Sequence, residues 1–139
     1  MRAALPSWLP FALGSAFFAA LTAVFAKLGV TALNPDLATF VRTAVILLVT
    51  AAVVTARGEW LRPEALPTGA VVFLALSAVA TALSWLCYFR ALESGPVAGV
   101  VSVDKLSVVL VVGLAALLVG EWPSWRVVAG AVLVALPRS

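Results

Sequence analysis

The chain has 139 residues, of which 64% are hydrophobic and 11% are charged, with a formal net charge of +3. A soluble domain normally carries about 25% charged residues, so this composition excludes a water-soluble domain with a polar shell. A lone Cys87 and the absence of His exclude a disulfide framework, a metal site built on Cys or His, and histidine acid/base chemistry. The cations are spread along the chain rather than clustered, which argues against nucleic-acid binding.

The apolar residues fall into blocks near the ~20 residues that a helix needs to cross a hydrocarbon core. The sequence predicts one membrane domain, residues 1–139, with helices over about 8–30, 35–56, 67–90, 96–119 and 123–136. The first segment is not a signal peptide, because it is long, lacks a small-x-small cleavage site and is followed by further spans. The predicted fold class is all-α, a polytopic integral membrane protein of about five transmembrane helices.

Local signals mark several ends of these helices. Asn34-Pro35-Asp36 is a helix start, with Asn as N-cap, Pro at the first position and an acid against the helix dipole. Trp60 lies in a polar loop and is predicted to anchor it at the membrane interface. The last helix, 123–136, would rise only about 21 Å. Local thinning of the membrane, shelter by protein and a lost tail all remain open as explanations.

The distribution of positive charge bears on orientation, because cytoplasmic loops carry excess Lys and Arg. With the N-terminus on side one, that side holds Arg2, Arg57, Arg62 and Arg126. Side two holds Lys27, Arg42, Arg90 and Arg138, and counting Lys27 and Arg42 as intramembrane favours the N-terminus inside. Such a near balance permits insertion in both orientations, so that two copies would form an inverted pair. A single orientation and a parallel dimer remain alternatives.

Asp104 and Lys105 stand inside the predicted fourth helix, where charged residues are costly and are candidates for function. Adjacent residues on a helix point about 100° apart, so the two either compensate each other imperfectly or find partners on other helices. A purely structural ion pair is the alternative. The chain uses Arg for seven of its nine cations, and its two lysines, Lys27 and Lys105, lie at the edge of one span and inside another. Burial readily shifts the pKa of Lys, so proton coupling through Lys105 or Asp104 is a hypothesis.

Further polar groups lie on the second and third helices. Arg42 stands within two turns of the start of the second helix and either snorkels or faces a cavity. A polar stripe on the third helix consists of Ser77, Thr81, Ser84 and Tyr88, with Trp85 beside it and Arg90 at its end. Such a stripe suits a solute path, although Ser and Thr also serve helix packing in lipid.

Several segments resemble EamA-type proteins of the drug/metabolite transporter superfamily, and most closely its half-size, five-helix bacterial/archaeal transporter family. The segments are 23–29, 37–43, 84–92 and 103–109, of which Tyr-Phe-Arg-Ala-Leu (88–92) and Asp-Lys-Leu-Ser (104–107) are the most specific. The resemblance implies half of a ten-helix transport unit, a solute pathway lined by the first four helices, and an outer fifth helix. The shortened fifth helix departs from the family pattern.

The resulting hypothesis is a secondary transporter of the bacterial or archaeal cytoplasmic (inner) membrane, exporting small metabolites by alternating access as a homodimer, with neither cofactor nor metal. Asp104 and Lys105 would bind solute or couple transport, and the other candidate site residues are Arg42, Trp85, Tyr88, Arg90 and Lys27. The deep acid beside a lysine favours a carboxylate or zwitterionic solute over a lipophilic cation. The alternative is a non-transporting membrane subunit or scaffold. An intramembrane enzyme is disfavoured, because Asp104 is the one acid deep in a span and no nucleophile or phosphate motif occurs.

Overall fold

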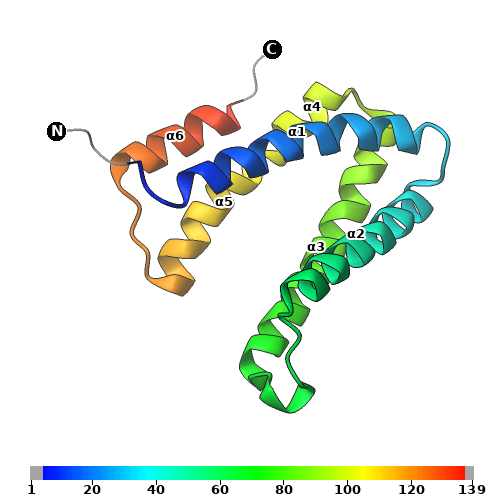
Figure 1. The fold of residues 1–139 in the computed structure, drawn as a ribbon. Helices are drawn as coiled ribbons and strands as arrows, with labels where there is room; N and C mark the ends of the chain where they lie inside the picture. The colour runs from blue at the N-terminus through cyan, green and yellow to red at the C-terminus, as the bar shows by residue number, and fades with distance from the viewer. Residues whose placement is uncertain (1–4, 137–139) are drawn as a thin grey trace. The chain divides into compact units, whose positions relative to one another are not determined.

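The computed structural model describes residues 5–136, and every regular element within that range is helical (Figure 1). The helices are α1 (Leu9–Val30), α2 (Pro35–Arg57), α3 (Thr68–Ser94), α4 (Val97–Asp104), α5 (Leu106–Leu114) and α6 (Trp125–Ala135). A 3-10 turn, Pro63–Ala65, precedes α3, and a π-helical turn, Ala115–Val119, continues α5.

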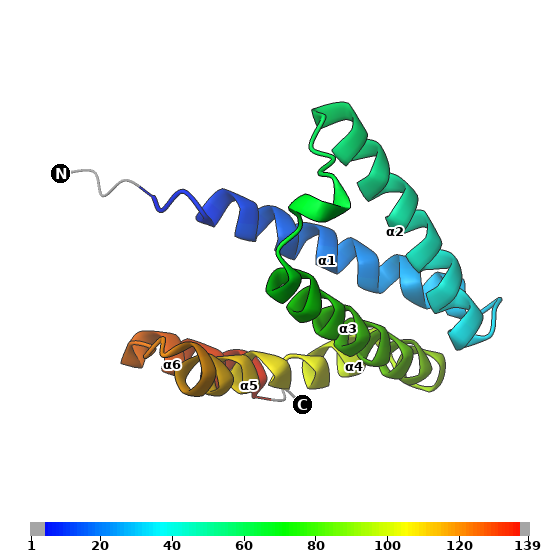
Figure 2. The ribbon, with the colours of Figure 1, turned by 90° about the horizontal axis from the view of Figure 1, so that it is seen from below.

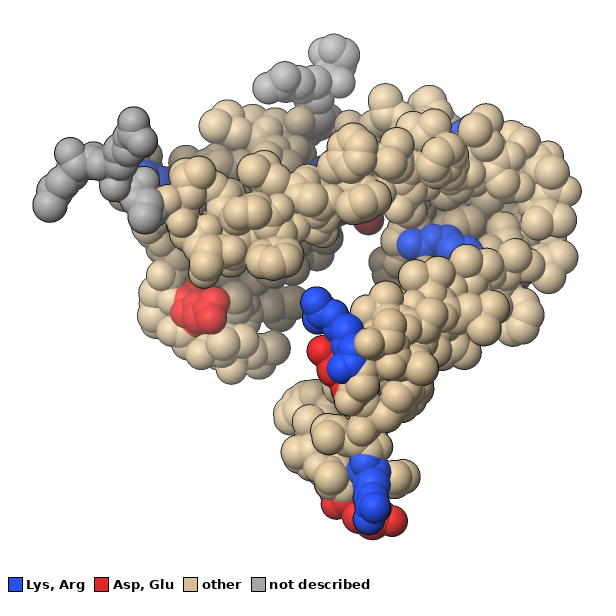
Figure 3. All heavy atoms as spheres, in the orientation of Figure 1, with Lys and Arg blue, Asp and Glu red and all other residues tan. Residues whose placement is uncertain are grey.

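Four stretches are long and apolar enough to cross a membrane. They are Leu9–Val30, Pro35–Arg57, Thr68–Ser94 and Val97–Val119, with α6 as a shorter apolar helix. Their outward surfaces carry large hydrophobic side chains, as lipid-facing helices do. On the face drawn in Figure 3, charged side chains are few and scattered over an otherwise uncharged surface. The predicted all-helical membrane fold is thereby confirmed.

The chain divides into two compact units. One unit holds residues 27–93, and so contains the end of α1, all of α2 and nearly all of α3. The other combines the earlier part of α1 with the chain from residue 94 onward, including α4, α5 and α6. The first boundary falls inside α1, between Ala26 and Lys27.

Both ends of α2 carry the groups that helix termini require. The Asn34 side chain accepts a hydrogen bond of 2.9 Å from the Asp36 N–H, and Pro35 occupies the first position, as predicted. Gly58 ends the helix with φ 65°, a left-handed conformation that glycine adopts without a steric penalty. The Trp60 indole N–H then donates to the Thr55 hydroxyl at 2.9 Å, which holds the following loop against the helix end.

The third helix runs one turn further than the sequence predicted, ending at Ser94 rather than near Arg90. Its first residue is Thr68, directly after Pro67. The helical backbone continues past Arg90 until Gly95, the residue before Pro96. Proline restricts the residue that precedes it to extended conformations, so this is where the helix has to stop.

The predicted fourth helix, 96–119, is interrupted at Lys105. This residue separates α4 from α5 with φ −65° and ψ −11°. Its N–H donates to the Val101 carbonyl at 3.1 Å, and its own carbonyl accepts from the Val108 N–H at 3.0 Å, a spacing of three residues rather than four. One turn of tighter winding therefore stands in the middle of a membrane span, next to Asp104.

The last helix is shorter than predicted. It begins at Trp125 after the N-cap Ser124, and its 11 residues rise about 16 Å. It packs against α5 in the same unit, with Ala131 and Ala135 buried. Small side chains let helices approach closely, which suits the packing of α6 against α5.

Eight hydroxyl groups in or directly after the spans bond to the backbone of the preceding turn. Each of the following donates to a carbonyl three or four residues earlier, at 2.7–2.9 Å: Thr22, Thr31, Thr39, Thr43, Thr50, Thr55, Thr81 and Ser102. This back-bonding removes the cost of a free hydroxyl in lipid without any contact between helices.

Candidate functional site

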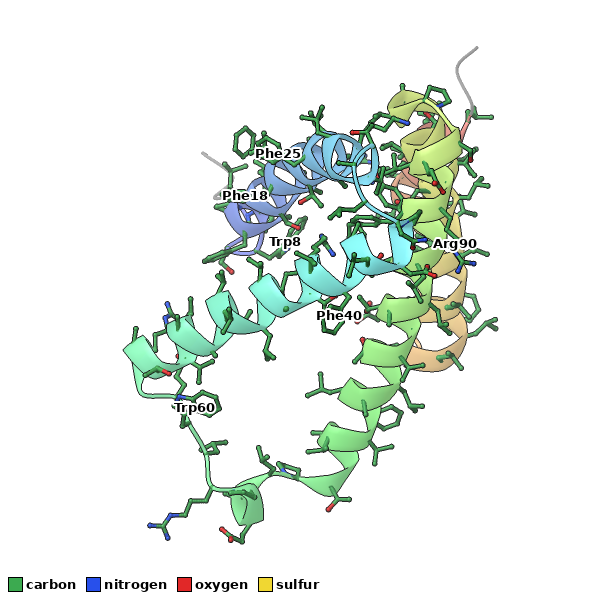
Figure 4. All side chains as sticks on the ribbon, turned by 90° about the vertical axis from the view of Figure 1, so that its right-hand side faces the viewer. Trp8, Phe18, Phe25, Phe40, Trp60 and Arg90 are labelled. Atoms are coloured by element: carbon green, nitrogen blue, oxygen red, sulfur yellow. The ribbon has the colours of Figure 1, made fainter. Side chains whose placement is uncertain are left out.

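The beginning of α2 meets the end of α3 within one unit. Figures 2 and 4 both show the two helices converging there and diverging toward the 58–67 loop. The buried side chains at this end are Pro35, Ala38 and Thr39 of α2 with Phe89 and Leu92 of α3. The buried residues are small on α2 and large on α3, a combination that permits close packing. We call residues 35–42 together with residues 85–92 the α2–α3 junction.

An ion pair joins the two helices at the outer end of the junction. The Arg90 guanidinium donates to both carboxylate oxygens of Asp36, with Nη2–Oδ2 at 3.0 Å, Nη2–Oδ1 at 3.1 Å and Nε–Oδ1 at 3.3 Å. Arg90 is labelled in Figure 4, where it lies beside the start of α2. Both side chains are more than half exposed, so the pair lies at the rim rather than in the interior.

Deeper in the junction, Arg42 lies against an aromatic cluster. Its guanidinium carbon is 3.6 Å from the centroid of the Trp85 ring, a close stacking contact. Trp85 packs edge-on against Tyr88 and Phe89, with ring centroids 5.1 and 5.7 Å away. Arg42 follows Asp36 by six residues, whereas Trp85 precedes Arg90 by five, so the two helices run antiparallel in matched register.

Lys27 tethers the end of α1 to the end of α3. Its ammonium group donates a hydrogen bond to the backbone carbonyl of Leu92. The last carbonyls of a helix have no partner within the helix, and a cation is favourable beside them. Leu92 is also fully buried. The geometry therefore gives Lys27 a capping role at the closed end of the junction.

The structure brings five of the seven sequence-predicted site residues into one unit. They are Lys27, Arg42, Trp85, Tyr88 and Arg90. Of the polar stripe on α3, only the last residue, Tyr88, lies in the α2–α3 junction. Ser77, Thr81 and Ser84 are exposed on the part of α3 before the junction, and the Thr81 hydroxyl donates to the Ser77 carbonyl at 2.8 Å.

Asp104 and Lys105 belong to the other unit, at the interruption between α4 and α5. Asp104 is exposed and Lys105 is half-buried. Within the described part of that unit, no salt bridge or side-chain hydrogen bond involves either residue. Neighbouring positions on a helix do not face each other, which explains why two adjacent opposite charges fail to pair.

Two junction residues escaped the sequence-based prediction of the site. Asp36 had been interpreted only as an acid at a helix start, and Phe89 only as part of a motif. The sequence did hold a signal for the Asp36–Arg90 pair. When the acids are assigned to the two sides of the membrane as the cations were, Asp36 and Arg90 lie on the same side. Phe89 lies four residues after Trp85, one helical turn along the same face.

Little else in the described residues offers a site. A depression of about 260 Å³ is lined by Ser102, Leu133, Val134 and Leu136, all from α4, α6 and its end. The Ser102 hydroxyl donates to the Ala98 carbonyl, and the remaining lining side chains are apolar. Among residues 5–136, no group of three or more His, Cys, Asp or Glu side chains is placed to hold a metal ion.

Comparison with known proteins gives two matches. The family described as "EamA-like transporter family" matches residues 6–136. A protein of Sinorhizobium sp. named "Uncharacterized transporter in cobO 3'region" is 55% identical over 115 residues, which cover 83% of this chain and 82% of that relative. No solved structure matches the chain.

Proposed function

The chain belongs to the EamA-like transporter family, and from that membership we propose a secondary transporter that exports small metabolites by alternating access as a homodimer. The observation that carries this proposal is the family match over nearly the whole chain, combined with four candidate spans and one short helix. A multi-pass protein of this kind belongs in the cytoplasmic membrane of a bacterium or archaeon.

The charges inside the spans support transport over a purely structural role. Arg42 lies about 10 Å along α2, and Asp104 and Lys105 lie within the stretch Val97–Val119. Such residues are expensive in hydrocarbon and typically mark solute or ion pathways. In this proposal Arg42, Trp85 and Tyr88 line the path, while Asp104 and Lys105 bind solute or couple its movement.

Pairing of two copies would supply the second, inverted set of helices that one chain lacks. Many transporters alternate access by rocking two inverted repeats around a site near the bilayer midplane. One chain of this length holds a single set of helices, and its Lys and Arg residues are nearly balanced between the two sides. Two oppositely inserted copies would therefore restore the inverted pair.

Export can be tested through the medium of cells that produce the protein. Cells carrying the unaltered chain are expected to release at least one metabolite faster than cells carrying Lys105→Ala, while both variants form the same oligomer. Arg126→Ala, at the exposed start of α6, is the matched control and should leave release unchanged. If Lys105→Ala instead disrupts the oligomer and no metabolite differs, the chain is a scaffold.

Labelling of single cysteines tests the inverted pair. In a Cys87→Ser background, Glu64→Cys and Glu93→Cys place thiols at the two ends of α3. An impermeant reagent applied to intact cells should label both sites in comparable fractions if the chain inserts both ways. Labelling of one site alone contradicts the antiparallel homodimer and calls for a parallel assembly.

A further inference from the structure

We propose that Arg42, held on the face of Trp85, is the docking point for the carboxylate of a small organic solute with an apolar body. The inference rests on the proposed transport function and names the class of solute at that site. Three features support it: the charge balance of residues 27–93, the position of the guanidinium over Trp85, and the aromatic side chains beside it.

The charge of Arg42 is not neutralised inside its own unit. The acid nearest to it along α2 is Asp36, and both oxygens of that carboxylate accept hydrogen bonds from Arg90. Within residues 27–93, no carboxylate binds Arg42, which lies against the Trp85 ring. A guanidinium keeps its charge at all physiological pH values and carries five N–H donors. A half-buried cation of this kind in a membrane span therefore favours an anionic ligand.

The N–H donors of the Arg42 guanidinium are available to a ligand. The guanidinium carbon lies 3.6 Å from the centroid of the Trp85 ring, and within residues 27–93 no hydrogen bond or salt bridge uses the N–H donors of Arg42. A carboxylate binds the edge of a guanidinium through two parallel hydrogen bonds, with more geometric specificity than an ammonium group provides.

The surroundings select the rest of the solute. Trp85 and Tyr88, both half-buried, form an aromatic wall next to the guanidinium, and the buried Phe89 packs behind them. An apolar body, aliphatic or aromatic, gains contact with that wall while the carboxylate meets Arg42. A lipid phosphate offers related chemistry, but its two acyl chains have to remain in the bilayer, whereas the wall lies at the half-buried junction.

The binding test uses three probes of similar size and different charge. Phenylacetate, 2-phenylethanol and 2-phenylethylamine are titrated onto the protein in phosphatidylcholine nanodiscs, and quenching of Trp85 fluorescence is recorded. The reporter variant keeps Trp85 alone, with Phe at the other four positions: Trp8, Trp60, Trp122 and Trp125. Calorimetry on the otherwise unaltered chain repeats the titration, so that the result does not depend on those substitutions.

Phenylacetate is expected to bind saturably and more tightly than the neutral and cationic probes. Arg42→Gln should weaken it by about tenfold or more, the loss expected for charge-assisted hydrogen bonds. Arg42→Lys should restore it only partly, because the planar fork is lost. Arg57→Gln is the matched control, since that arginine pairs with Glu59 in the loop, and it should change nothing. Equal binding of all three probes, or an unchanged affinity in Arg42→Gln, overturns the proposal.

Lipid composition distinguishes a free solute from a headgroup. If Arg42 is a phospholipid site, replacing half of the phosphatidylcholine by phosphatidylglycerol will abolish phenylacetate binding, which overturns the solute assignment. Retained affinity supports it. Binding requires no transport: if phenylacetate binds at Arg42 but cells release no metabolite, the transport proposal fails alone. If cells release metabolites, and Arg42→Gln matches the unaltered chain in both phenylacetate binding and metabolite release, only the assignment of the solute site to Arg42 is wrong.

Discussion

The α2–α3 junction and the α4–α5 interruption both carry charged residues in apolar helices, yet they treat them in opposite ways. At the junction, Asp36 meets Arg90 and Arg42 meets Trp85, partners separated by 54 and 43 positions in the sequence. At the interruption, Asp104 and Lys105 are adjacent in sequence and form no salt bridge with each other. Compensation therefore follows the facing surfaces of helices and not proximity along the chain. The charged residues of the junction are therefore paired by contacts between helices. Those of the interruption have no such contact within the described part of their own unit.

The largest expected effect comes from removing the buried centre of the junction. Leu92→Ala should lower the free energy of unfolding by about 2–5 kcal/mol, because Leu92 is 0% exposed and a cavity would remain. Leu74→Ala on the same helix is the control, since its side chain is 69% exposed and leaves no cavity. Unfolding in mixed micelles with increasing denaturing detergent measures both. Equal losses would show that the junction is not the packed part of this unit.

A pair of lysine substitutions compares the two regions directly. Lys27→Met should lower the free energy of unfolding by about 1 kcal/mol, because the Leu92 carbonyl loses its donor. Lys105→Met should not lower it, since removing a charge with no local partner from an apolar span removes a cost. The same detergent titration measures the stability of both variants. Metabolite release should show the reverse order, with a larger loss for Lys105→Met than for Lys27→Met. A larger stability loss for Lys105→Met would mean that the interruption is structural as well.

The smallest effect concerns the exposed pair at the rim. Asp36→Asn or Arg90→Gln alone should reduce stability less than Lys27→Met does, because exposed ion pairs contribute little and are screened by salt. Exchanging the two, Asp36→Arg with Arg90→Asp, should recover part of the loss. A double-mutant cycle at low and high salt provides the measurement. If the coupling energy of the pair does not change with salt, the pair is less solvated than its exposure indicates.

Signals that are local in sequence predicted the structure well. The Asn34-Pro35-Asp36 start of α2 acts within four residues, and its cap forms as expected. The third helix was predicted to end near Arg90 and ends at Ser94, because Gly95 stands before Pro96 and is restricted to extended conformations. The change of winding at Lys105 has no comparable sequence signal, since neither glycine nor proline stands there.

The candidate site was predicted by its residue types but not by its arrangement. Arg42 and Trp85 were each expected near a solute path, yet their stacking depends on the antiparallel register of α2 and α3. Arg90 was placed near the path without its partner, because Asp36 had a sufficient local explanation as a first-turn acid. Pairing between helices is decided by packing, which a single sequence leaves open.

The hydroxyl groups that bond within their own helices have a mechanical consequence. Thr43, Thr50 and Thr81 each close a loop of one turn on their own backbone, so no hydroxyl of theirs has to be exchanged when a neighbour moves. A helix of this kind can roll or tilt against another with van der Waals contacts as the main resistance. These threonines therefore place no hydrogen bond between helices, whereas Arg90 with Asp36 and Arg42 with Trp85 connect α2 and α3 at the junction.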